Sequence, residues 1–472
     1  MNRQIFKLAA TVLLALVALS SCGDKVRQME KKGWKKADEV LARIHEPRFP
    51  ELTVSVLDYG LKAGEEVYGQ AISEAVKACA EQGGGTVVVP AGTYYTGPIE
   101  LLSHVRLHFE DGAVLYFSNR PEDYLPQVIT RWEGWDCYNF RPLIYAYGQE
   151  DIAITGHGVL DGQASNTAWW PWKGRKSFGW QEGMLCQEWN GDKLSGRNRL
   201  AAMEAAEVPV EERLMQPEDC LRPPFVQPYL CRNVLIEGIT IHHSPFWLLH
   251  PLLCENVIVR GVTLESYGPN NDGCDPESCR DVLIEDCYFN TGDDCIAIKS
   301  GRNKDGFRWN TPTENVVVRN CRMKDGHGGI VIGSEISGGC HWVWAENCEM
   351  DSPNLDRIVR LKTNPLRGGN ISNLYVRNVR VGVCGESIMR VELKYEGVKS
   401  GPNMPSLSDI FLSDIHSSGS RYGVWIDGFE DVVNVHGVHL RSCTLDNVRD
   451  GNRILGAEDV SFDKVLLNGE AL

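Results

Sequence analysis

Hydrophobic residues in the second half of the chain recur at offsets 0, 2, 5 and 7 from the start of each copy. Period-2 alternation indicates a strand with one buried face, and the step of three marks a corner where the chain turns onto a new sheet. The copies begin at Val234, Val257, Val282, Val316, Val343, Leu374, Ile410 and Val438. Repeats of this length without a helical pattern indicate a solenoid. We therefore predict an all-β, single-stranded, right-handed parallel β-helix, since a β-sandwich would not repeat this signature.

Stacked coils convert sequence offset into position along the solenoid. Asp293 follows Val282 by 11 residues, and His327 follows Val316 by 11, so the two side chains should be neighbours about 4.8 Å apart. Aligning Cys274 with Cys295 places Asp272 beside Asp293. Adjacent strand residues face opposite ways, so a bend at Gly292 is needed for Asp293 and Asp294 to reach the same surface.

The strands after these motifs carry cations at outward positions. If Ile296, Ile298, Val359 and Leu361 point inward, Lys299, Arg360 and Lys362 point outward on one face. The chain has a formal charge of −15, which argues against a nucleic-acid partner. An anionic substrate would need a local concentration of cations, and these three residues would supply it.

The N-terminus has the features of an export signal. Residues 1–21 begin with Arg3 and Lys7 and continue into an apolar run that is too short to span a bilayer. The run ends in Leu-Ser-Ser followed by Cys22, which resembles a bacterial lipobox. We expect a lipoprotein signal peptide over residues 1–22, lipidation of Cys22, a tether over 23–49 and a β-helix domain over 50–472. The protein would be an exported lipoprotein, periplasmic or on the cell surface, that contacts the membrane only through its lipid.

Two further features refine this domain. A Trp-rich insertion at about 163–225 interrupts the repeat and interleaves Lys173, Arg175 and Lys176 with its aromatic residues. Such insertions often lie on the binding face, where aromatic rings and cations suit acidic sugars, but the Trp residues could equally pack the insertion onto the body. Of the fifteen cysteines after Cys22, several occupy inward repeat positions, namely Cys287, Cys321 and Cys443. The sequence contains no CxxC pair, so a zinc site is not expected.

Four motifs in order resemble those of glycoside hydrolase family 28, the polygalacturonases and their relatives. They are residues 270–272 (Asn-Asn-Asp), 292–294 (Gly-Asp-Asp), 326–328 (Gly-His-Gly) and 360–362 (Arg-Leu-Lys). The family usually has Thr in place of Asn271 and Ile in place of Leu361, and neither change touches a reacting group. The resemblance implies the pectin-lyase-like β-helix. Residues 244–247 (Ser-Pro-Phe-Trp), with His250 after them, look like exo-acting and bacterial members.

The resemblance also implies roles for individual residues. Asp293 matches the general acid, while Asp272 and Asp294 match the pair that activates water in an inverting hydrolysis. His327 would hydrogen-bond to this cluster and help to hold the protonation state of the acid. Arg360 and Lys362 match the residues that grip a uronic acid carboxylate, and Asn270 is placed to hydrogen-bond a sugar hydroxyl. No metal and no cofactor are required.

The function implied is hydrolysis of α-1,4-galacturonosyl linkages in pectin or oligogalacturonides, with exo action, by a monomer. The insertion would close one end of the cleft. A rhamnogalacturonan or xylogalacturonan hydrolase of the same family remains an alternative. Two other classes are a pectate lyase, which would need calcium-binding acids, and a non-catalytic glycan-binding β-helix, against which the intact acid cluster argues.

Overall fold

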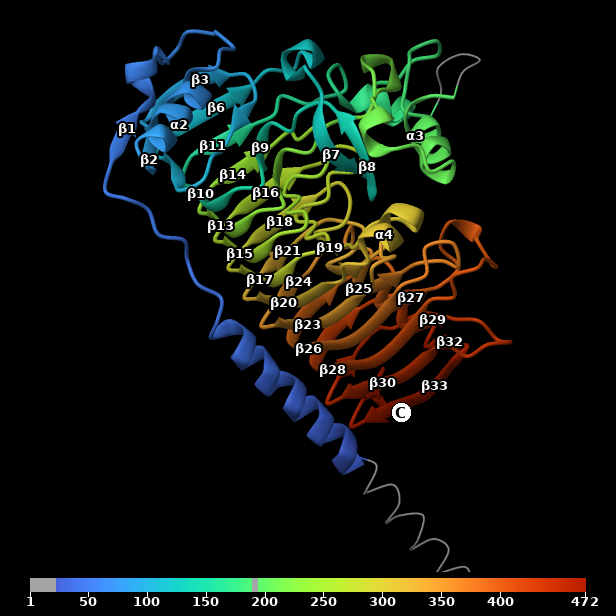
Figure 1. Cartoon of the computed structure of the whole chain (residues 1–472). Helices are drawn as coiled ribbons and strands as arrows, with labels where there is room; N and C mark the ends of the chain where they lie inside the picture. The colour runs from blue at the N-terminus through green and yellow to red at the C-terminus, as the bar shows by residue number, and fades with distance from the viewer. Residues whose placement is uncertain (1–22, 189–193) are drawn as a thin grey trace, which may run out of the picture.

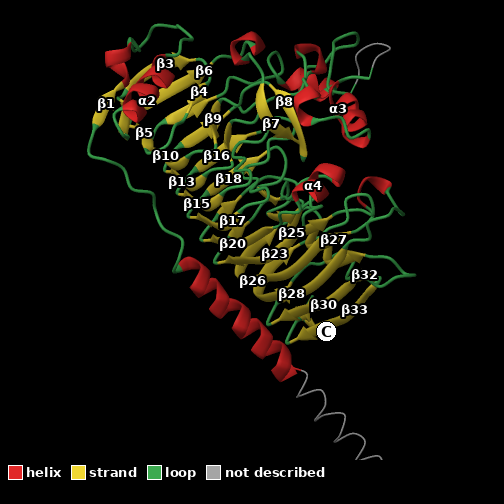
Figure 2. Cartoon of the chain, in the orientation of Figure 1, coloured by secondary structure: helices red, strands yellow, loops and turns green. Residues whose placement is uncertain are grey.

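Three parallel sheets run along one elongated body, and the chain winds around them coil by coil (Figures 1 and 2). The structure is a computed structural model that describes residues 23–188 and 194–472. Pairings between its named strands are parallel except for β7–β8 and β34–β35. The predicted right-handed parallel β-helix is therefore confirmed.

The first two sheets meet at the corner that the repeat predicts. The first sheet contains β1 (Thr53–Ser55), β2 (Gly85–Val89), β5 (Val105–Phe109), β10 (Glu150–Gly156), β13 (Arg232–Glu237), β15 (Glu255–Arg260), β17 (Arg280–Glu285), β20 (Thr313–Arg319), β23 (Cys340–Glu346), β26 (Asn370–Val383), β28 (Ser406–Gly419), β30 (Val435–Arg441) and β33 (Ala457–Asp463). The second contains β3 (Gly92–Thr96), β6 (Ala113–Phe117), β11 (Val159–Asp161), β14 (Thr240–His242), β16 (Thr263–Ser266), β18 (Tyr288–Thr291), β21 (Arg322–Met323), β24 (Glu349–Met350), β31 (Thr444–Leu445), β34 (Leu466–Leu467) and the terminal β35 (Glu470–Ala471). Strands β26 and β28 run through the corner and join the two sheets.

The third sheet carries the edge on which the site is built. It contains β4 (Ile99–Glu100), β9 (Ile144–Tyr147), β12 (Val226–Tyr229), β19 (Ile296–Ile298), β22 (Ile330–Ile332), β25 (Arg357–Lys362), β27 (Ser387–Glu392), β29 (Tyr422–Asp427) and β32 (Arg453–Leu455). Ile298 pairs with Ile332, which pairs with Leu361, so Lys299 and Lys362 follow the same register.

The repeat register holds throughout the second half. Val234 pairs with Val257, Val257 with Val282 and Val282 with Val316. The later starts continue the same column, in the order Val343, Leu374, Ile410 and Val438. These side chains are almost fully buried, so one column of apolar residues forms one wall of the continuous core.

Each corner has a residue in the left-handed backbone region, four positions after the start of its copy. The φ values are 55° at Asp286, 55° at Asn320, 56° at Asn347 and 51° at Asn378. Asn and Asp tolerate this conformation better than other non-glycine residues. The Asn378 amide also donates to Oδ1 of Asn347 at 2.7 Å. The step of three in the hydrophobic pattern is therefore a turn of defined backbone geometry.

Two helices cover parts of the solenoid. Helix α2 (Ala71–Glu81) closes the N-terminal end through Ile72, Ala75, Val76 and Cys79. Residues 23–41 form a second helix that lies across the outer face of the first sheet (Figure 1). There Trp34 packs with Trp344, Tyr375 and Phe411, and Trp344 Nε1 donates to the Gly33 carbonyl at 3.0 Å. The segment expected to be a polar tether is thus in large part a docked helix, because its apolar stripe meets a ladder of aromatic residues.

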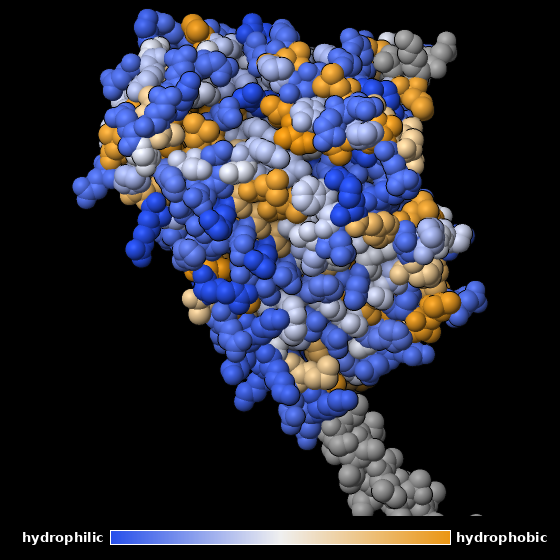
Figure 3. All heavy atoms as spheres, in the orientation of Figure 1, coloured by the Kyte–Doolittle hydropathy of each residue, from blue (hydrophilic) through white to orange (hydrophobic). Residues whose placement is uncertain are grey.

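The described residues contain no helix that is long and apolar enough to cross a bilayer. On the face in Figure 3, hydrophilic residues predominate over the lower coils, and hydrophobic residues occur in separate patches. The predicted signal peptide and Cys22 lie outside the described residues. The fifteen described cysteines are buried and unpaired, including the three predicted to face inward.

A lobe overhangs the third sheet. It consists of the antiparallel hairpin β7 (Val128–Trp132) and β8 (Trp135–Asn139), helix α3 (Gly196–Ala205) and the loops of the insertion, with helix α4 (Asn303–Trp309) below them (Figure 1). Trp169 is buried against Tyr124 and Phe140, and Trp170 Nε1 donates to the Ser244 carbonyl. These two Trp residues therefore pack the insertion onto the body.

Candidate active site

The three carboxylates predicted to share a surface lie together where the second sheet gives way to the third. One oxygen from each of Asp272, Asp293 and Asp294 lies within 4.8 Å of the others. Strand β18 ends at Thr291 and β19 begins at Ile296, so the two adjacent aspartates sit in a bend. A Cβ at Gly292 would stand 2.3 Å from the Gly268 carbonyl oxygen, which explains why the bend starts with glycine. The bend expected at this position is confirmed.

Asp293 and His327 form a hydrogen-bonded pair at the mouth of the cluster. His327 Nδ1 lies 3.0 Å from Asp293 Oδ1, and the Asp294 amide donates to the same oxygen at 3.0 Å. Hydrogen bonding to Asp293 raises the pKa of His327 to about 9. Burial opposes ionisation of Asp293, but the His327 hydrogen bond and the nearby Lys362 lower its pKa overall. In the free site the proton of this pair therefore rests on the imidazole.

Among the three clustered carboxylates, Asp272 is the one whose pKa is raised, and burial raises the pKa of the neighbouring Asp275 as well. Burial, followed by the repulsion of Asp275 and Asp293, raises the pKa of Asp272 well above its usual value. In the free site the pKa is therefore raised at Asp272 and lowered at Asp293, the residue that matches the general acid. The strand register differs from the prediction by one residue. Cys274 pairs with Ile296 and not with Cys295, so Asp272 aligns with Asp294.

Asp294 is fully buried and faces two cations. Lys362 Nζ donates to Asp294 Oδ2 at 2.6 Å, and Arg360 lies 3.9 Å from Oδ1. Oδ1 accepts no hydrogen bond from the described residues. A buried acceptor without a partner is costly, so this oxygen is suited to receive a hydrogen bond from a bound water molecule.

Lys299 is held inside the site by four groups. Its Nζ lies 3.7 Å from Asp272, 3.7 Å from Asp275 and 3.2 Å from Glu335, and it stands 4.5 Å above the ring of Trp247. Lys299, Arg360 and Lys362 all line the same pocket, which confirms the face predicted for them. Arg360 also donates to Glu392 at 3.2 Å.

Asn270 lines the pocket and Asn271 does not. Asn270 has a φ of 56° and accepts a 2.9 Å hydrogen bond from the buried Arg222. Asn271 is buried, accepts from Ser266 and Gly268, and donates to the carbonyls of Ser244 and Phe246. The residue that departs from the family motif therefore fixes the loop and leaves the chemistry untouched.

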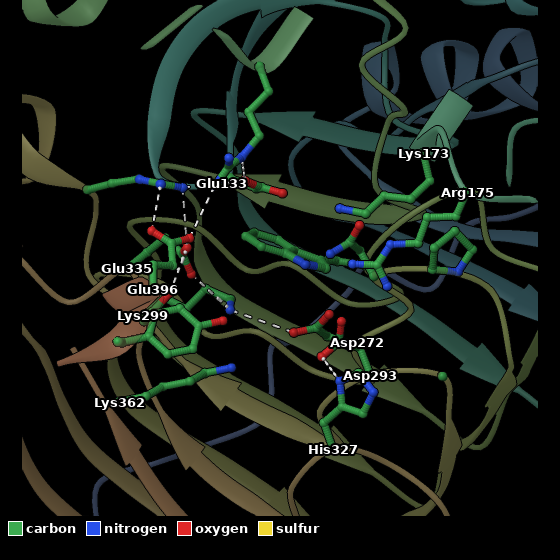
Figure 4. Close-up of a pocket in the computed structure, with 18 of the residues that line it drawn as sticks. Glu133, Lys173, Arg175, Asp272, Asp293, Lys299, His327, Glu335, Lys362 and Glu396 are labelled. Carbon is green, nitrogen blue, oxygen red and sulfur yellow. Dashed lines mark hydrogen bonds and ion pairs between the residues drawn. The ribbon is translucent and has the colours of Figure 1, made fainter. Parts of the chain in front are cut away.

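The pocket has a volume of about 400 Å³ and is lined mainly by charged residues (Figure 4). One side of the pocket is bordered by a group of ion pairs that we call the wall, formed by Glu133, Arg197, Arg302, Arg367 and Glu396. Arg197 lies 2.9 Å from Glu133 and 3.2 Å from Glu396. Arg302 lies 3.4 Å from Glu133, and Arg367 lies 2.9 Å from Glu396. The wall therefore ties together the β7–β8 turn, helix α3, the start of α4 and the loops after β25 and β27.

Sequence reasoning missed the wall and also Asp275. Asp275 is fully buried, and neither carboxylate oxygen accepts a hydrogen bond from the described residues. The only sequence signal for Asp275 is that it follows Asp272 by three residues, and this spacing predicts little where the strand is irregular. The wall residues come from segments far apart in the sequence, and nothing in their local patterns links them.

Comparison with known proteins identifies the family. Residues 215–447 match the model described as Glycosyl hydrolases family 28. The crystal structure of a hyperthermoactive exopolygalacturonase from Thermotoga maritima is 40% identical, with a TM-score of 0.88 over 94% of this chain and 97% of that one. The chain belongs to glycosyl hydrolase family 28. This family 28 enzyme is a glycosidase, and the resemblance predicted from the four motifs is confirmed.

Two curated relatives are more distant. A probable polygalacturonase from Vitis vinifera is 29% identical over 79% of this chain and 67% of its own length. An exo-poly-alpha-D-galacturonosidase from Dickeya chrysanthemi is 25% identical over 72% of this chain, and the match spans 57% of that protein. The chain therefore spans about two thirds or less of the length of these two relatives.

Proposed function

We propose that this family 28 enzyme releases galacturonic acid from the ends of galacturonan chains in pectin. The ion pairs of the wall are the observation that supports exo action. They would block a continuing chain and admit only a chain terminus, so we call the side of the pocket at the wall its closed end. Lys299, Arg360 and Lys362 supply positive charge beside the acid cluster, which suits a sugar with a carboxylate. The similar exopolygalacturonase of Thermotoga maritima supports the same substrate class.

The catalytic roles of the three aspartates are assigned from their exposure to the pocket and from their hydrogen-bond partners. Asp272 and Asp293 both line the pocket, and Asp293 Oδ2 has no hydrogen-bond partner among the described residues. Asp293 gives its proton to the leaving glycosidic oxygen. An anionic sugar beside it expels water and adds a negative charge, and both effects raise the pKa of Asp293 towards the protonated form. His327 keeps the carboxyl group oriented. The sugar leaves with a C–O bond broken and the proton on the departing hydroxyl.

Water attacks from the opposite face of the sugar. Asp294 Oδ1 takes one water proton, and Asp272 positions the same water while the new bond to the anomeric carbon forms. The nearest carboxylate oxygens lie within 4.8 Å, which is closer than the roughly 6.5–9.5 Å between carboxyl groups in most inverting enzymes. We place one water molecule between Asp294 Oδ1 and Asp272, because hydrogen bonds of about 2.8 Å to two oxygens can span this distance.

Parallel digests of polygalacturonic acid with and without chelator test the proposal. Saturated galacturonate monomer from the first time point is the expected product. A ladder of saturated oligomers would contradict exo action. Unsaturated products that absorb in the ultraviolet and disappear in chelator would favour the lyase. The cations bound to the acid cluster argue against that class, because calcium prefers an uncompensated set of oxygen ligands.

We also propose that residues 1–22 are a lipoprotein signal peptide and that Cys22 is lipidated. The charged start, the short apolar run and the Leu-Ser-Ser-Cys ending support this proposal. In cells, Cys22→Ala should move the protein from the membrane fraction to the soluble fraction. Retention of the variant in membranes would contradict lipidation at this residue.

A further inference from the structure

One cation of the pocket differs from the others. Six of them each form an ion pair with a carboxylate: Lys173, Arg197, Lys299, Arg302, Arg360 and Lys362. Arg175 lines the same pocket, but its guanidinium group has no ion pair or hydrogen-bond partner within residues 23–188 and 194–472. It is also exposed, so its guanidinium group stays hydrated and available. An unpaired Arg in a pocket crowded with compensated charges is suited to bind an anion from outside the protein.

The position of Arg175 places that anion away from the closed end. In Figure 4, Arg175 and Lys173 lie on one side of Asp272 and Asp293, while Lys299, Glu335 and Glu396 lie on the other. Both cations belong to the insertion, in the loop around the short helices Trp170–Lys173 and Lys176–Phe178. Phe178 lines the pocket as well and offers an apolar surface to a sugar ring.

We infer that Arg175, assisted by Lys173, binds the carboxylate of the sugar on the leaving-group side of the cleaved bond. This inference rests on the proposed function, because it takes the closed end as the position of the terminal uronic acid. The substrate would then carry acidic sugars on both sides of the bond. A run of consecutive galacturonic acids meets this requirement, whereas a backbone that alternates uronic acid with a neutral sugar does not.

An arginine at position 175 is well suited to bind a carboxylate. Its planar fork binds a carboxylate with two parallel hydrogen bonds, and Lys173 adds a second positive charge nearby. Lys173 is mostly buried and lies 3.9 Å from Glu188, so it contributes charge with less freedom to move. A methyl ester on the second sugar would remove the charge that Arg175 recognises, and the enzyme should then prefer unesterified stretches.

The test compares two substrates that differ only beyond the cleaved bond. Digalacturonate has a carboxylate on the leaving sugar, and a nitrophenyl α-galacturonide has a neutral aryl leaving group. Arg175→Gln should lower kcat/KM for digalacturonate by about 10–100-fold, as expected for loss of a charge-assisted hydrogen bond. The loss for the nitrophenyl substrate should be no more than about threefold. Lys176→Gln is the matched control, because it removes an exposed neighbouring cation that does not line the pocket.

The outcomes separate the two ideas. If the unmodified enzyme cleaves neither substrate, the proposed function is wrong. If it cleaves both and Arg175→Gln affects them equally, or affects neither, the role of Arg175 is wrong while the proposed function stands. A selective loss on digalacturonate that the Lys176→Gln control does not share supports the inference. Equal rates of the unmodified enzyme on free and methyl-esterified digalacturonate would also overturn it.

Discussion

His327 Nδ1 and Asp293 Oδ1 lie 3.0 Å apart, although 34 residues separate them in the chain. The contact exists because both residues stand at the same offset in successive coils, and the His327 amide also donates to the Asp293 carbonyl at 3.0 Å. Each residue changes the pKa of the other, since the paired state is charged on both sides. This pair gives the most direct physical test of the site.

The pKa of His327 should lie near 9 and should depend on Asp293. A histidine pKa raised by folding stabilises the native state below about pH 6.5, and this contribution is lost as the pH rises through about 9. Titration of the imidazole C–H resonances would measure the value. Asp293→Asn should return it towards about 6.5, whereas Glu122→Gln, a change of an exposed carboxylate, should leave it in place. An unshifted His327 in Asp293→Asn would contradict the pairing.

Asp293→Asn should also remove most turnover. The amide keeps the size and the hydrogen bonds of the side chain but cannot donate a proton to the leaving oxygen, so kcat should fall by about 10²–10⁴-fold. Binding of a galacturonate oligomer, measured by calorimetry, should persist. Near-normal kcat in this variant would show that Asp293 is not the acid, and Asp272→Asn would then be the next variant to test.

Lys362→Ala should impair both binding and turnover. Lys362 contacts Asp294 at 2.6 Å, so its loss leaves a buried carboxylate without its ion-pair partner. Its loss also weakens binding of the substrate's uronate carboxylate. We expect kcat/KM on galacturonan oligomers to fall by at least about 100-fold, which corresponds to about 3 kcal/mol. Lys399→Ala, an exposed cation in a nearby loop, should have no effect. An equal loss on neutral aryl galactosides would contradict a role in recognising the carboxylate.

Arg197→Ala should open the closed end of the pocket. Arg197 joins Glu133 to Glu396, so its removal breaks the connection between the hairpin and the loop after β27. Products of polygalacturonic acid, resolved by size over time, should change from monomer alone to a mixture with longer oligomers. Lys304→Ala changes a nearby cation outside the pocket and should leave the products unchanged. Monomer as the sole product of Arg197→Ala would mean that the wall does not determine exo action.

Trp34→Ala should destabilise the solenoid. Trp34 is 8% exposed and lies under the guanidinium group of Arg377, 3.7 Å from its ring centre. Truncation of a buried Trp costs about 3–5 kcal/mol, so thermal or denaturant unfolding of residues 23–472 should show a clear loss. Lys35→Ala changes the exposed side of the same helix and should be close to neutral. Equal stability of Trp34→Ala would show that the helix does not contribute to the folded state.

The sequence predicted the coil register because period-2 alternation and a turn residue recur with every copy. Val282 and Val316 pair as expected, and Asp293 meets His327 for the same reason. The prediction was wrong by one residue at Cys274, which pairs with Ile296. The repeat spacing does not predict the register of that strand, because loops of variable length precede it. Residues 23–49 were predicted to be a tether because they are polar. Their apolar residues form a packing surface only because Trp344, Tyr375 and Phe411 of the solenoid lie opposite them.

The solenoid, the acid cluster and the face that carries Lys299, Arg360 and Lys362 follow from the sequence pattern, because stacking turns a repeated offset into proximity. Long-range packing produced the ion pairs of the wall, the raised pKa of Asp272 and a guanidinium group at Arg175 that has no partner among the described residues. Those properties depend on long-range contacts: burial and neighbouring charge set the pKa of Asp272, and ion pairs between distant loops form the wall. No local pattern encodes which charges meet when the lobe folds over the third sheet.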